Sequence, residues 1–146
     1  MRIGISMFVI ALSVLAAGGG TTYSSPPEGI LRVAPPTVKF GTKRVGTFTL
    51  KGAVITNTTS RRINLYVAID SMPDDFSFGL WPGSTCDPFQ PAPLEPGDSC
   101  KAVVGFRPSD FFTGHEQRAA LAAIASDPDT GEVLETVLIE FFGTGN

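Results

Sequence analysis

The chain has 146 residues, a length typical of one domain, and 11 Lys and Arg stand against 14 Asp and Glu, for a formal net charge of −3. This slightly acidic balance excludes the basic face that nucleic-acid binding requires, so no nucleic-acid partner is expected. No run of like charge exceeds two residues, which excludes an acidic tail and a polybasic membrane patch.

Residues 1–19 have the order of a secretory signal peptide. Arg2 is followed by an apolar run from Met7 to Ala17 and then by small residues. A membrane span needs about 18–20 apolar residues, so we expect no stable transmembrane span after cleavage; an uncleaved anchor is the alternative. No cysteine follows the run, which argues against a lipid anchor. We therefore expect an exported protein that is periplasmic, associated with the cell envelope, or extracellular.

Residues 20–30 are small, polar and proline-containing, and we expect a flexible lead-in. From residue 31 the chain becomes a succession of short alternating apolar runs separated by turn residues. Pro35 and Pro36 cannot donate hydrogen bonds to a sheet, so this segment and the short strand ending near Gly41 should lie at an edge. A strand is then expected over Gly46–Asn57. The next, over residues 63–70, shows a clear period of two, with Ile63, Leu65, Val67 and Ile69 on one face.

The second half continues this pattern. Phe76 and Phe78 stand between turn signals, and residues 99–108 carry inward-facing Ala102, Val104 and Phe106. The alanine-rich residues 115–126 would also suit a helix. The turn residues Asp127–Gly131 and the strand pattern after them favour a hairpin instead.

Short strands with turn signals every 8–12 residues or so are typical of an antiparallel β-sandwich. The absence of βαβ spacing argues against a parallel sheet. We therefore predict an all-β fold: an immunoglobulin-like antiparallel β-sandwich of about seven to eight strands over residues 31–146, preceded by the signal peptide.

Two cysteines, Cys86 and Cys100, follow the export signal. In an oxidising compartment such a pair is first interpreted as a disulfide, which would close a loop of about 15 residues and contribute roughly 3 kcal/mol. The alternatives are a metal pair, which would need two more ligands, and a redox dithiol, which would favour C-x-x-C spacing.

Four blocks of the sequence resemble a known family. They are "PPTVKFGTKRVGT", "ITNTTSRRINLYV", "DDFSF…STC…LEPGDSCKAVVGFRP" and "FFGTGN", and they extend over about Ala34 to Asn146. Their order is similar to that of the Hydin-like and abnormal-spindle-like immunoglobulin domains called ASH domains, and most of all to the bacterial choice-of-anchor D type. The resemblance implies a sandwich of seven to eight strands, Cys86 bonded to Cys100, and no enzymatic activity.

Candidate catalytic and metal-binding residues are few. His115 is the only histidine and has no G-x-S-x-G elbow beside it. The Asp127–Gly131 segment lacks the further ligands of a calcium loop, and the adjacent Asp74 and Asp75 would point to opposite faces of a strand. Asn57 begins a glycosylation sequon, but at a strand end it is expected to bond the following turn instead. We expect no enzyme, no metal and no cofactor.

Aromatic residues offer a possible interaction surface. Trp81, Phe89, Phe111 and Phe112 would form a binding patch if exposed, or would pack in the core and loops. The expected function is a non-catalytic exported module for protein interaction or cell-envelope structural support, through loops or a sheet edge. Its partner is an unknown protein or envelope component. The alternative is a carbohydrate- or surface-binding adhesin domain, with Trp81 and a loop phenylalanine exposed on one side.

Overall fold

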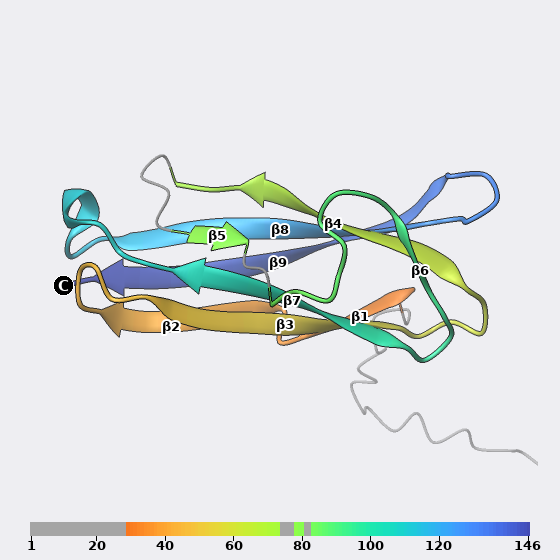
Figure 1. The fold of residues 1–146 in the computed structure, drawn as a ribbon, viewed down its shortest axis with the longest axis horizontal. Coiled ribbons are helices and arrows are strands. Elements are labelled where there is room, and N and C mark those ends of the chain that lie inside the picture. The colour runs from red at the N-terminus through yellow and green to blue at the C-terminus, as the bar shows by residue number, and fades with distance from the viewer. Residues whose placement is uncertain (1–28, 74–77, 81–82) are drawn as a thin grey trace, which may run out of the picture.

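The computed structural model describes residues 29–73, 78–80 and 83–146. The predicted signal peptide, nearly all of the lead-in, Phe76 and Trp81 lie outside this part. Within it the chain forms nine strands and one short 3₁₀ turn (Figure 1). In chain order these are β1 (Leu31–Ala34), β2 (Thr37–Lys43), β3 (Thr49–Asn57), β4 (Ile63–Ser71), β5 (Phe78–Leu80), β6 (Ala92–Leu94), β7 (Ser99–Phe106), η1 (Asp110–Phe112), β8 (Glu116–Ser126) and β9 (Val133–Gly145).

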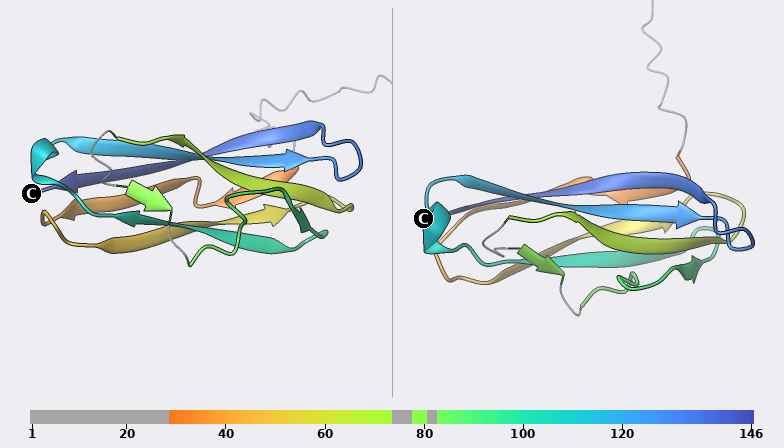
Figure 2. Two further views of the ribbon diagram at one scale, coloured as in Figure 1. Left: turned by 45° about the horizontal axis from the view of Figure 1, so that its top comes forward. Right: turned by 90° about the horizontal axis from the view of Figure 1, so that it is seen from above.

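The strands make two sheets packed face to face, as Figure 2 shows from two further sides. One sheet has the order β1-β3-β7-β5 and the other the order β2-β9-β8-β4-β6. The predicted immunoglobulin-like sandwich is confirmed. The nine strands are one more than the seven to eight predicted, and the additional strand is β6. It has only three residues, one of them Pro93, which is too short for an alternating pattern to be recognised in the sequence.

One strand pair is parallel, although the sequence argued against a parallel sheet. The chain leaves the first sheet at Pro35–Pro36 and continues as β2 beside the last strand, β9, in the second sheet. β2 and β9 are far apart in the sequence, so they pair in parallel without a βαβ unit. The absence of βαβ spacing in the sequence therefore did not reveal this pair. Both β1 and β2 are edge strands, as the two prolines predict.

The segment 115–126, for which a helix and a strand were both considered, is a strand. β8 lies between β4 and β9 and pairs antiparallel with both. The predicted hairpin turn follows it: the amide of Gly131 donates to the carbonyl of Asp127, and Gly131 has a φ of 73°. The alanines of β8 are buried. Alanine also has the highest helix propensity, which is why this sequence resembles a helix as well.

The core lies between the sheets and includes an aromatic cluster. Phe40 lies 5.2 Å from Phe106 and 5.8 Å from Phe78 between ring centroids, and Phe141 completes the group. The predicted inward faces of β4 and β7 are buried, including Ile63 and Val104. The prediction for Ile69 is wrong: its side chain is half exposed, next to a register shift in the pairing of β4 with β8. Among the described residues, no helix is long and apolar enough to cross a membrane.

Candidate interaction surface

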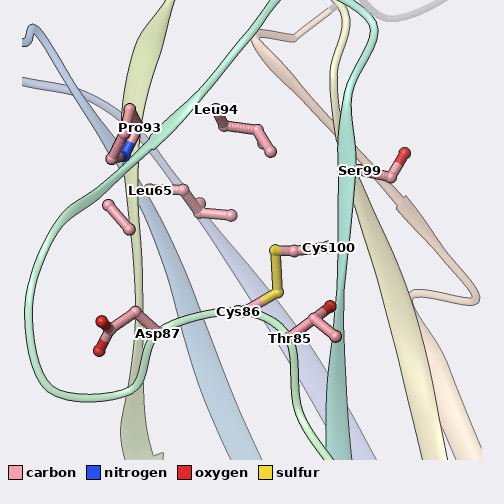
Figure 3. Close-up of a pocket in the computed structure, with 9 residues that line it drawn as sticks. Leu65, Thr85, Cys86, Asp87, Pro93, Leu94, Ser99 and Cys100 are labelled. Atoms are coloured by element: carbon pink, nitrogen blue, oxygen red, sulfur yellow. A yellow bond between two sulfur atoms is a disulfide. The ribbon is translucent and has the colours of Figure 1, made fainter.

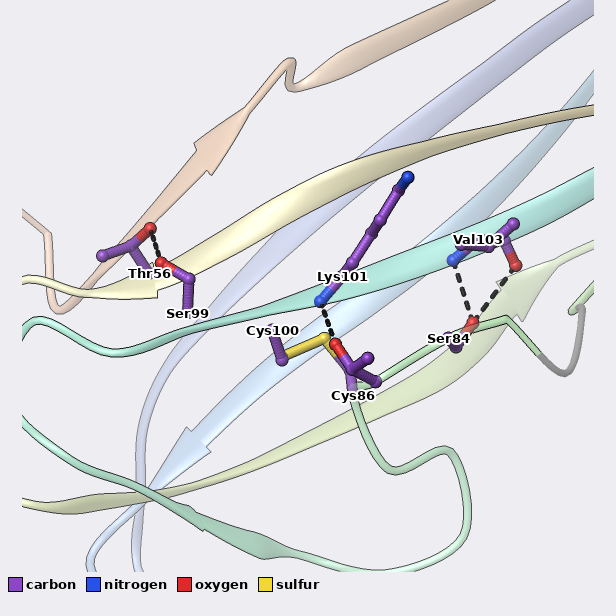
Figure 4. Close-up of a disulfide and its surroundings, with 8 residues drawn as sticks. Thr56, Ser84, Cys86, Ser99, Cys100, Lys101 and Val103 are labelled. Carbon is purple, nitrogen blue, oxygen red and sulfur yellow. Dashed lines mark hydrogen bonds between the residues drawn. A yellow bond between two sulfur atoms is a disulfide. The ribbon is translucent and has the colours of Figure 1, made fainter.

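The disulfide predicted between Cys86 and Cys100 is present, with the two Cα atoms 5.0 Å apart. It joins the β5–β6 segment to the start of β7. Hydroxyl groups extend this attachment along the strand, because Lys101 N donates to Thr85 Oγ1 (2.8 Å) and Val103 N donates to Ser84 Oγ (2.9 Å) (Figure 4). Where β5 has ended, side-chain oxygens therefore satisfy backbone donors along the edge of β7.

A pocket of about 170 Å³ opens beside the disulfide. Leu65, Leu94 and the two cysteines face one another across it (Figure 3), and Ala92 and Pro93 add to the apolar lining. Its polar lining comes from Thr85, Asp87 and Ser99. β6 belongs to one sheet and β7 to the other, so the turn that connects them crosses from one layer to the other beside the pocket.

The connection from β6 to β7 is the predicted Pro-Gly turn. Gly97 has a φ of 78°, and the amide of Asp98 donates to the carbonyl of Glu95 (3.0 Å). Asn57 fixes the start of this turn through hydrogen bonds. Its fully buried side chain donates from Nδ2 to the carbonyls of Arg61 (2.9 Å) and Leu94 (3.0 Å).

The Asn57 side chain also accepts from Thr59, at 3.0 Å from the amide and 2.7 Å from the hydroxyl. The local bond predicted for this strand-end asparagine is thus confirmed, and it is joined by a long-range bond to Leu94 that the sequence did not indicate. Both atoms of the amide group are used in these bonds, so Asn57 acts as a structural residue.

Both edge strands on the β1–β2 side are capped by charged side chains from the opposite sheet. Glu135 Oε2 accepts from the amide of Leu31 on β1 (2.7 Å). Lys51 Nζ donates to the carbonyl of Lys39 on β2 (2.6 Å) and lies 6.0 Å from the Phe40 ring centroid. Charged groups at an open edge are a common defence against pairing with another strand. A strand that added here would have to displace them.

Phe89 protrudes from the β5–β6 loop, with 90% of its surface exposed. The turn that carries it is tightly bonded, because Asp87 Oδ1 accepts from the amides of Phe89 (2.8 Å) and Gln90 (3.1 Å). Asp87 also lines the pocket, so Phe89 stands beside the pocket. A large apolar side chain held out by an ordered turn is a candidate contact residue.

Phe111 is the other exposed loop phenylalanine, at 83%. It lies in η1, where the hydroxyl of Thr113 donates to the carbonyl of Asp110 (3.1 Å). Trp81 and the side chain of Phe112 lie outside the described residues.

The structure does not bring Phe89 and Phe111 together. Phe89 precedes β6, in which Ala92 pairs with Leu65 of β4. Leu65 in turn pairs with Ala125 of β8, and Ala125 pairs with Glu135 of β9. η1 precedes Thr113, which bridges to Gly145. Glu135 and Gly145 are ten residues apart on β9, or about 30 Å at roughly 3.3 Å per residue. The carbonyl of Asp87 also accepts from the amide of Val67, so the Phe89 loop runs beside β4, and the two phenylalanines are separated by most of the length of β9.

Charged residues lie near both loops. Beside η1, the β2–β3 loop is bonded through its backbone to Pro108 and Asn146, so Lys43, Arg44 and Arg107 belong to this part of the chain. Around the pocket, Asp87 is joined by Glu95 and Asp98 in the adjoining turn. Opposite charges lie among both groups: Asp110 and Glu116 near η1, and Arg61 and Lys101 near the pocket. Sequence reasoning missed this arrangement and the pocket, because both depend on distant segments.

The remaining candidate residues for chemistry do not assemble. His115 lies exposed at the start of β8, and the described residues contain no group of three potential His, Cys, Asp or Glu metal ligands. Asp127 serves its own turn: its carboxylate accepts from the amides of Asp129 and Thr130. The bond from the Thr130 amide has the largest effect and that from Asp129 the next, and together they hold the pKa of Asp127 below its ordinary value of 3.8. Asp74 and Asp75 lie outside the described residues.

No protein-family model and no curated protein sequence match the chain. Solved structures do. The ASH/PapD-like domain 7 of human CEP192 aligns with a TM-score of 0.61 at 12% identity, covering 100% of this chain and 98% of that one. The fold is that of ASH and PapD-like domains.

Two further structures have related folds. WR4, an MSP family member of Caenorhabditis elegans, aligns with a TM-score of 0.51 at 11% identity over 80% of this chain and 99% of that one. The YadV chaperone aligns with a TM-score of 0.57 at 8% identity over 80% of this chain and 52% of that one. The chain thus spans about half the length of YadV. At these identities the likeness is one of fold, and the predicted resemblance to ASH domains is confirmed at that level.

Proposed function

We propose that the chain is an exported, non-catalytic immunoglobulin-like module that binds another protein, or supports a cell-envelope structure, through the ends of its sandwich. The observation that carries this is the exposure of Phe89 and Phe111 on ordered turns. Exposed aromatic side chains are costly in water and are enriched among the residues that dominate protein–protein binding energies.

At the β1 and β2 edges, bonds from charged side chains favour contact through loops over strand addition. Glu135 and Lys51 occupy backbone groups of β1 and β2, and Ser84 and Thr85 do the same for β7. A partner strand would have to break these bonds before making its own. Contact through the end loops requires no such exchange.

The export part of the proposal rests on the sequence of residues 1–19 and on the disulfide. Cys86 and Cys100 are bonded, and oxidising compartments form and keep such bonds. In this proposal residues 1–19 are a cleaved signal peptide, 20–30 a lead-in and 31–146 the working domain. The site of action is then the periplasm, the cell envelope or the extracellular space.

The test is crosslinking of the tagged chain in an envelope extract of its source organism, followed by mass spectrometry. We expect a stoichiometric protein with the wild type that is lost with Phe89→Ser or Phe111→Ser. Leu138→Ser is the matched control, because Leu138 is also exposed but lies on the outer face of β9. Equal recovery with all four proteins would contradict the proposal. Glycans alone, confirmed on an array, would favour the adhesin alternative.

A further inference from the structure

We propose that the outer face of the β1-β3-β7-β5 sheet binds to an anionic lipid membrane surface. This goes beyond the proposed function, because it concerns a sheet face and not the loops that carry Phe89 and Phe111. The residues of this face are the strand positions that alternate with core positions and therefore point away from the other sheet. Two properties of the face support the proposal: exposed apolar side chains and charges of one sign.

The exposed apolar side chains come from β3 and the residue before it. Ala53 is fully buried in the core, so Leu50 and Val54, at odd distances from it along the strand, point outward and are 44% and 40% exposed. Phe48 is also 44% exposed. The Phe48 ring and the Leu50 side chain both approach Gly105 of β7, so they lie next to each other. Contiguous exposed apolar surface of this kind often marks a binding site.

Three exposed cations share this face, because each stands between two residues that are packed in the interior. They are Arg32 on β1, Lys101 on β7 and Arg107 directly after β7. Lys101 is paired with Val54 of β3, and its Cε lies 3.3 Å from the position of a Cβ on Gly52. Its side chain extends from β7 on the side opposite to the disulfide (Figure 4). The stem of this lysine therefore follows the outer face while its ammonium group stays exposed.

No carboxylate on the four strands balances these cations. Strands β1, β3, β5 and β7 contain no Asp or Glu. The acidic residues nearest to β7 in the sequence, Asp98 and Asp110, lie in the turn before it and in η1 after it. On the other sheet, by contrast, Arg118 is paired with Glu116 (3.0 Å), and Glu140 is exposed. The whole chain has a net charge of −3, so this face has the opposite sign of charge to the chain as a whole.

The spacing of the cations favours a membrane over a single small ligand. Lys101 and Arg107 are six residues apart, about 20 Å at roughly 3.3 Å per residue, and Arg32 lies two strands away on β1. One small anion cannot contact all three, whereas an anionic bilayer presents negative charge over the whole area. Leu50 and Val54 lie on β3, between β1 and β7.

Peripheral membrane binding combines the burial of apolar side chains with attraction to anionic lipids. Each Lys or Arg near such a surface strengthens binding about fivefold. The outer face of this sheet supplies both contributions. Its three cations are separate in the sequence, so the absence of charged runs excluded a polybasic segment but did not reveal this face.

The first measurement is cosedimentation of the purified full chain, expressed with its own N-terminal segment, with lipid vesicles. One set of vesicles contains phosphatidylglycerol and phosphatidylcholine in equal parts, and the other contains phosphatidylcholine alone. We expect the partition coefficient to be at least about tenfold higher for the anionic vesicles and to fall as salt screens the charges. Equal binding to both sets, or binding to neither, would overturn the proposal.

Variants then test the face itself. Arg32→Glu/Lys101→Glu reverses two of its charges and should weaken binding to anionic vesicles at least about tenfold. Lys39→Glu/Arg62→Glu is the matched control, since it changes the net charge equally, but at exposed positions on β2 and in the β3–β4 turn. We expect this control to bind within about threefold of the wild type. All variants keep the N-terminal segment, so any contribution from it is common to them.

A second pair of variants tests the apolar contribution. Leu50→Ser should weaken binding to anionic vesicles at least about threefold. Leu138→Ser is the control, because Leu138 is similarly exposed but lies on the outer face of the other sheet, and it should bind as the wild type does. Equal binding by the two variants would show that the Leu50 side chain does not enter the membrane interface, and would overturn the proposed contact.

Equal losses with the two charge-reversed double variants would show that net charge, and not this face, attracts the protein to the vesicles, and would overturn the proposal. Each variant must keep the wild-type unfolding midpoint in urea. Where Arg32→Glu/Lys101→Glu does not fold, Arg32→Gln/Lys101→Gln takes its place and should weaken binding at least about fivefold. Unchanged binding by that variant would also contradict the proposal.

The face could instead contact a protein, and the capture experiment distinguishes this case. A captured protein that is lost with Arg32→Glu/Lys101→Glu, from a wild type that does not bind vesicles, would assign the face to a protein and overturn the membrane proposal. Failure of vesicle binding leaves the proposed function to be judged by Phe89→Ser and Phe111→Ser, which alter neither the cations nor the apolar side chains of this face.

Discussion

The ring of Phe106 lies directly over the backbone of Gly143, so that a Cβ on this glycine would collide with the ring. Two residues after Phe106 and Gly143 in the chain, Pro108 lies against Gly145, 2.8 Å from where a Cβ would stand. Phe106 and Pro108 end one block of the family resemblance, "…VVGFRP", and Gly143 and Gly145 belong to another, "FFGTGN". These two separate parts of the resemblance are therefore one packing unit. It fixes the end of β9 against the start of the segment that carries η1.

Gly143→Ala should therefore destabilise the fold, because the added methyl group must displace a fully buried ring. Overpacking of this kind costs about 1–3 kcal/mol, measured as a lower free energy of unfolding in urea. Gly79→Ala is the control, since a Cβ there meets nothing within 4 Å and should change stability by less than about 0.5 kcal/mol. Equal effects at both positions would show that backbone propensity, and not the Phe106 ring, sets the cost.

Asn57→Ala should also lower stability. It removes two donors and an acceptor from a buried site and leaves the carbonyl of Leu94 without the amide that bonds it. An unsatisfied buried polar group costs about 1–3 kcal/mol, so we expect a loss in that range from chemical unfolding. Asn64→Ala on the outer face of β4 serves as the control. A loss no larger than the control's would mean that water replaces these bonds at little cost.

The hydrogen bonds of Asn57 include both a part that the sequence predicted and a part that it could not predict. A strand-end asparagine and a Pro-Gly turn are local patterns, and both were predicted. That Asn57 supports the Leu94 carbonyl beside the pocket depends on a contact between residues 37 positions apart, which no local pattern contains. The same reason hides the parallel pairing of β2 with β9 and the pocket itself.

The aromatic residues show the same limit. Consecutive or isolated phenylalanines in loops do not reveal which face they take, because no periodicity orders them. The sequence grouped Phe89 with Phe111, whereas the register of β9 separates them by most of the length of that strand. Inward-facing residues of regular strands, such as Ile63 and Phe106, were predictable because alternation fixes their face.

Loss of the disulfide should destabilise the chain without changing the fold. The bond closes a loop with a sequence separation of 14, for which the chain-entropy estimate is about 3 kcal/mol. The double variant Cys86→Ser/Cys100→Ser should lose about 2–4 kcal/mol in urea unfolding, and the wild type should lose a similar amount in reducing agent. The double variant is its own control, since reductant should not affect it. An unfolding midpoint of the wild type that is equal with and without reductant would contradict the prediction.

Acid should weaken the β8–β9 turn through Asp127. The amides of Thr130 and Asp129 and the nearby Arg61 favour its charged form, so its pKa in the folded state is below the ordinary value of 3.8. A lowered folded pKa means that the unfolded chain takes up the proton first as the pH falls. The stabilisation is therefore fully present above pH 3.8 and is lost as the pH falls through the folded pKa. Asp127→Asn keeps an oxygen acceptor for the turn but cannot ionise, so the stability difference between wild type and variant should shrink on acidification from about pH 6 to pH 2. Urea unfolding of both proteins across this range measures it. A difference that stays constant with pH would show that the charge on Asp127 contributes nothing to the fold.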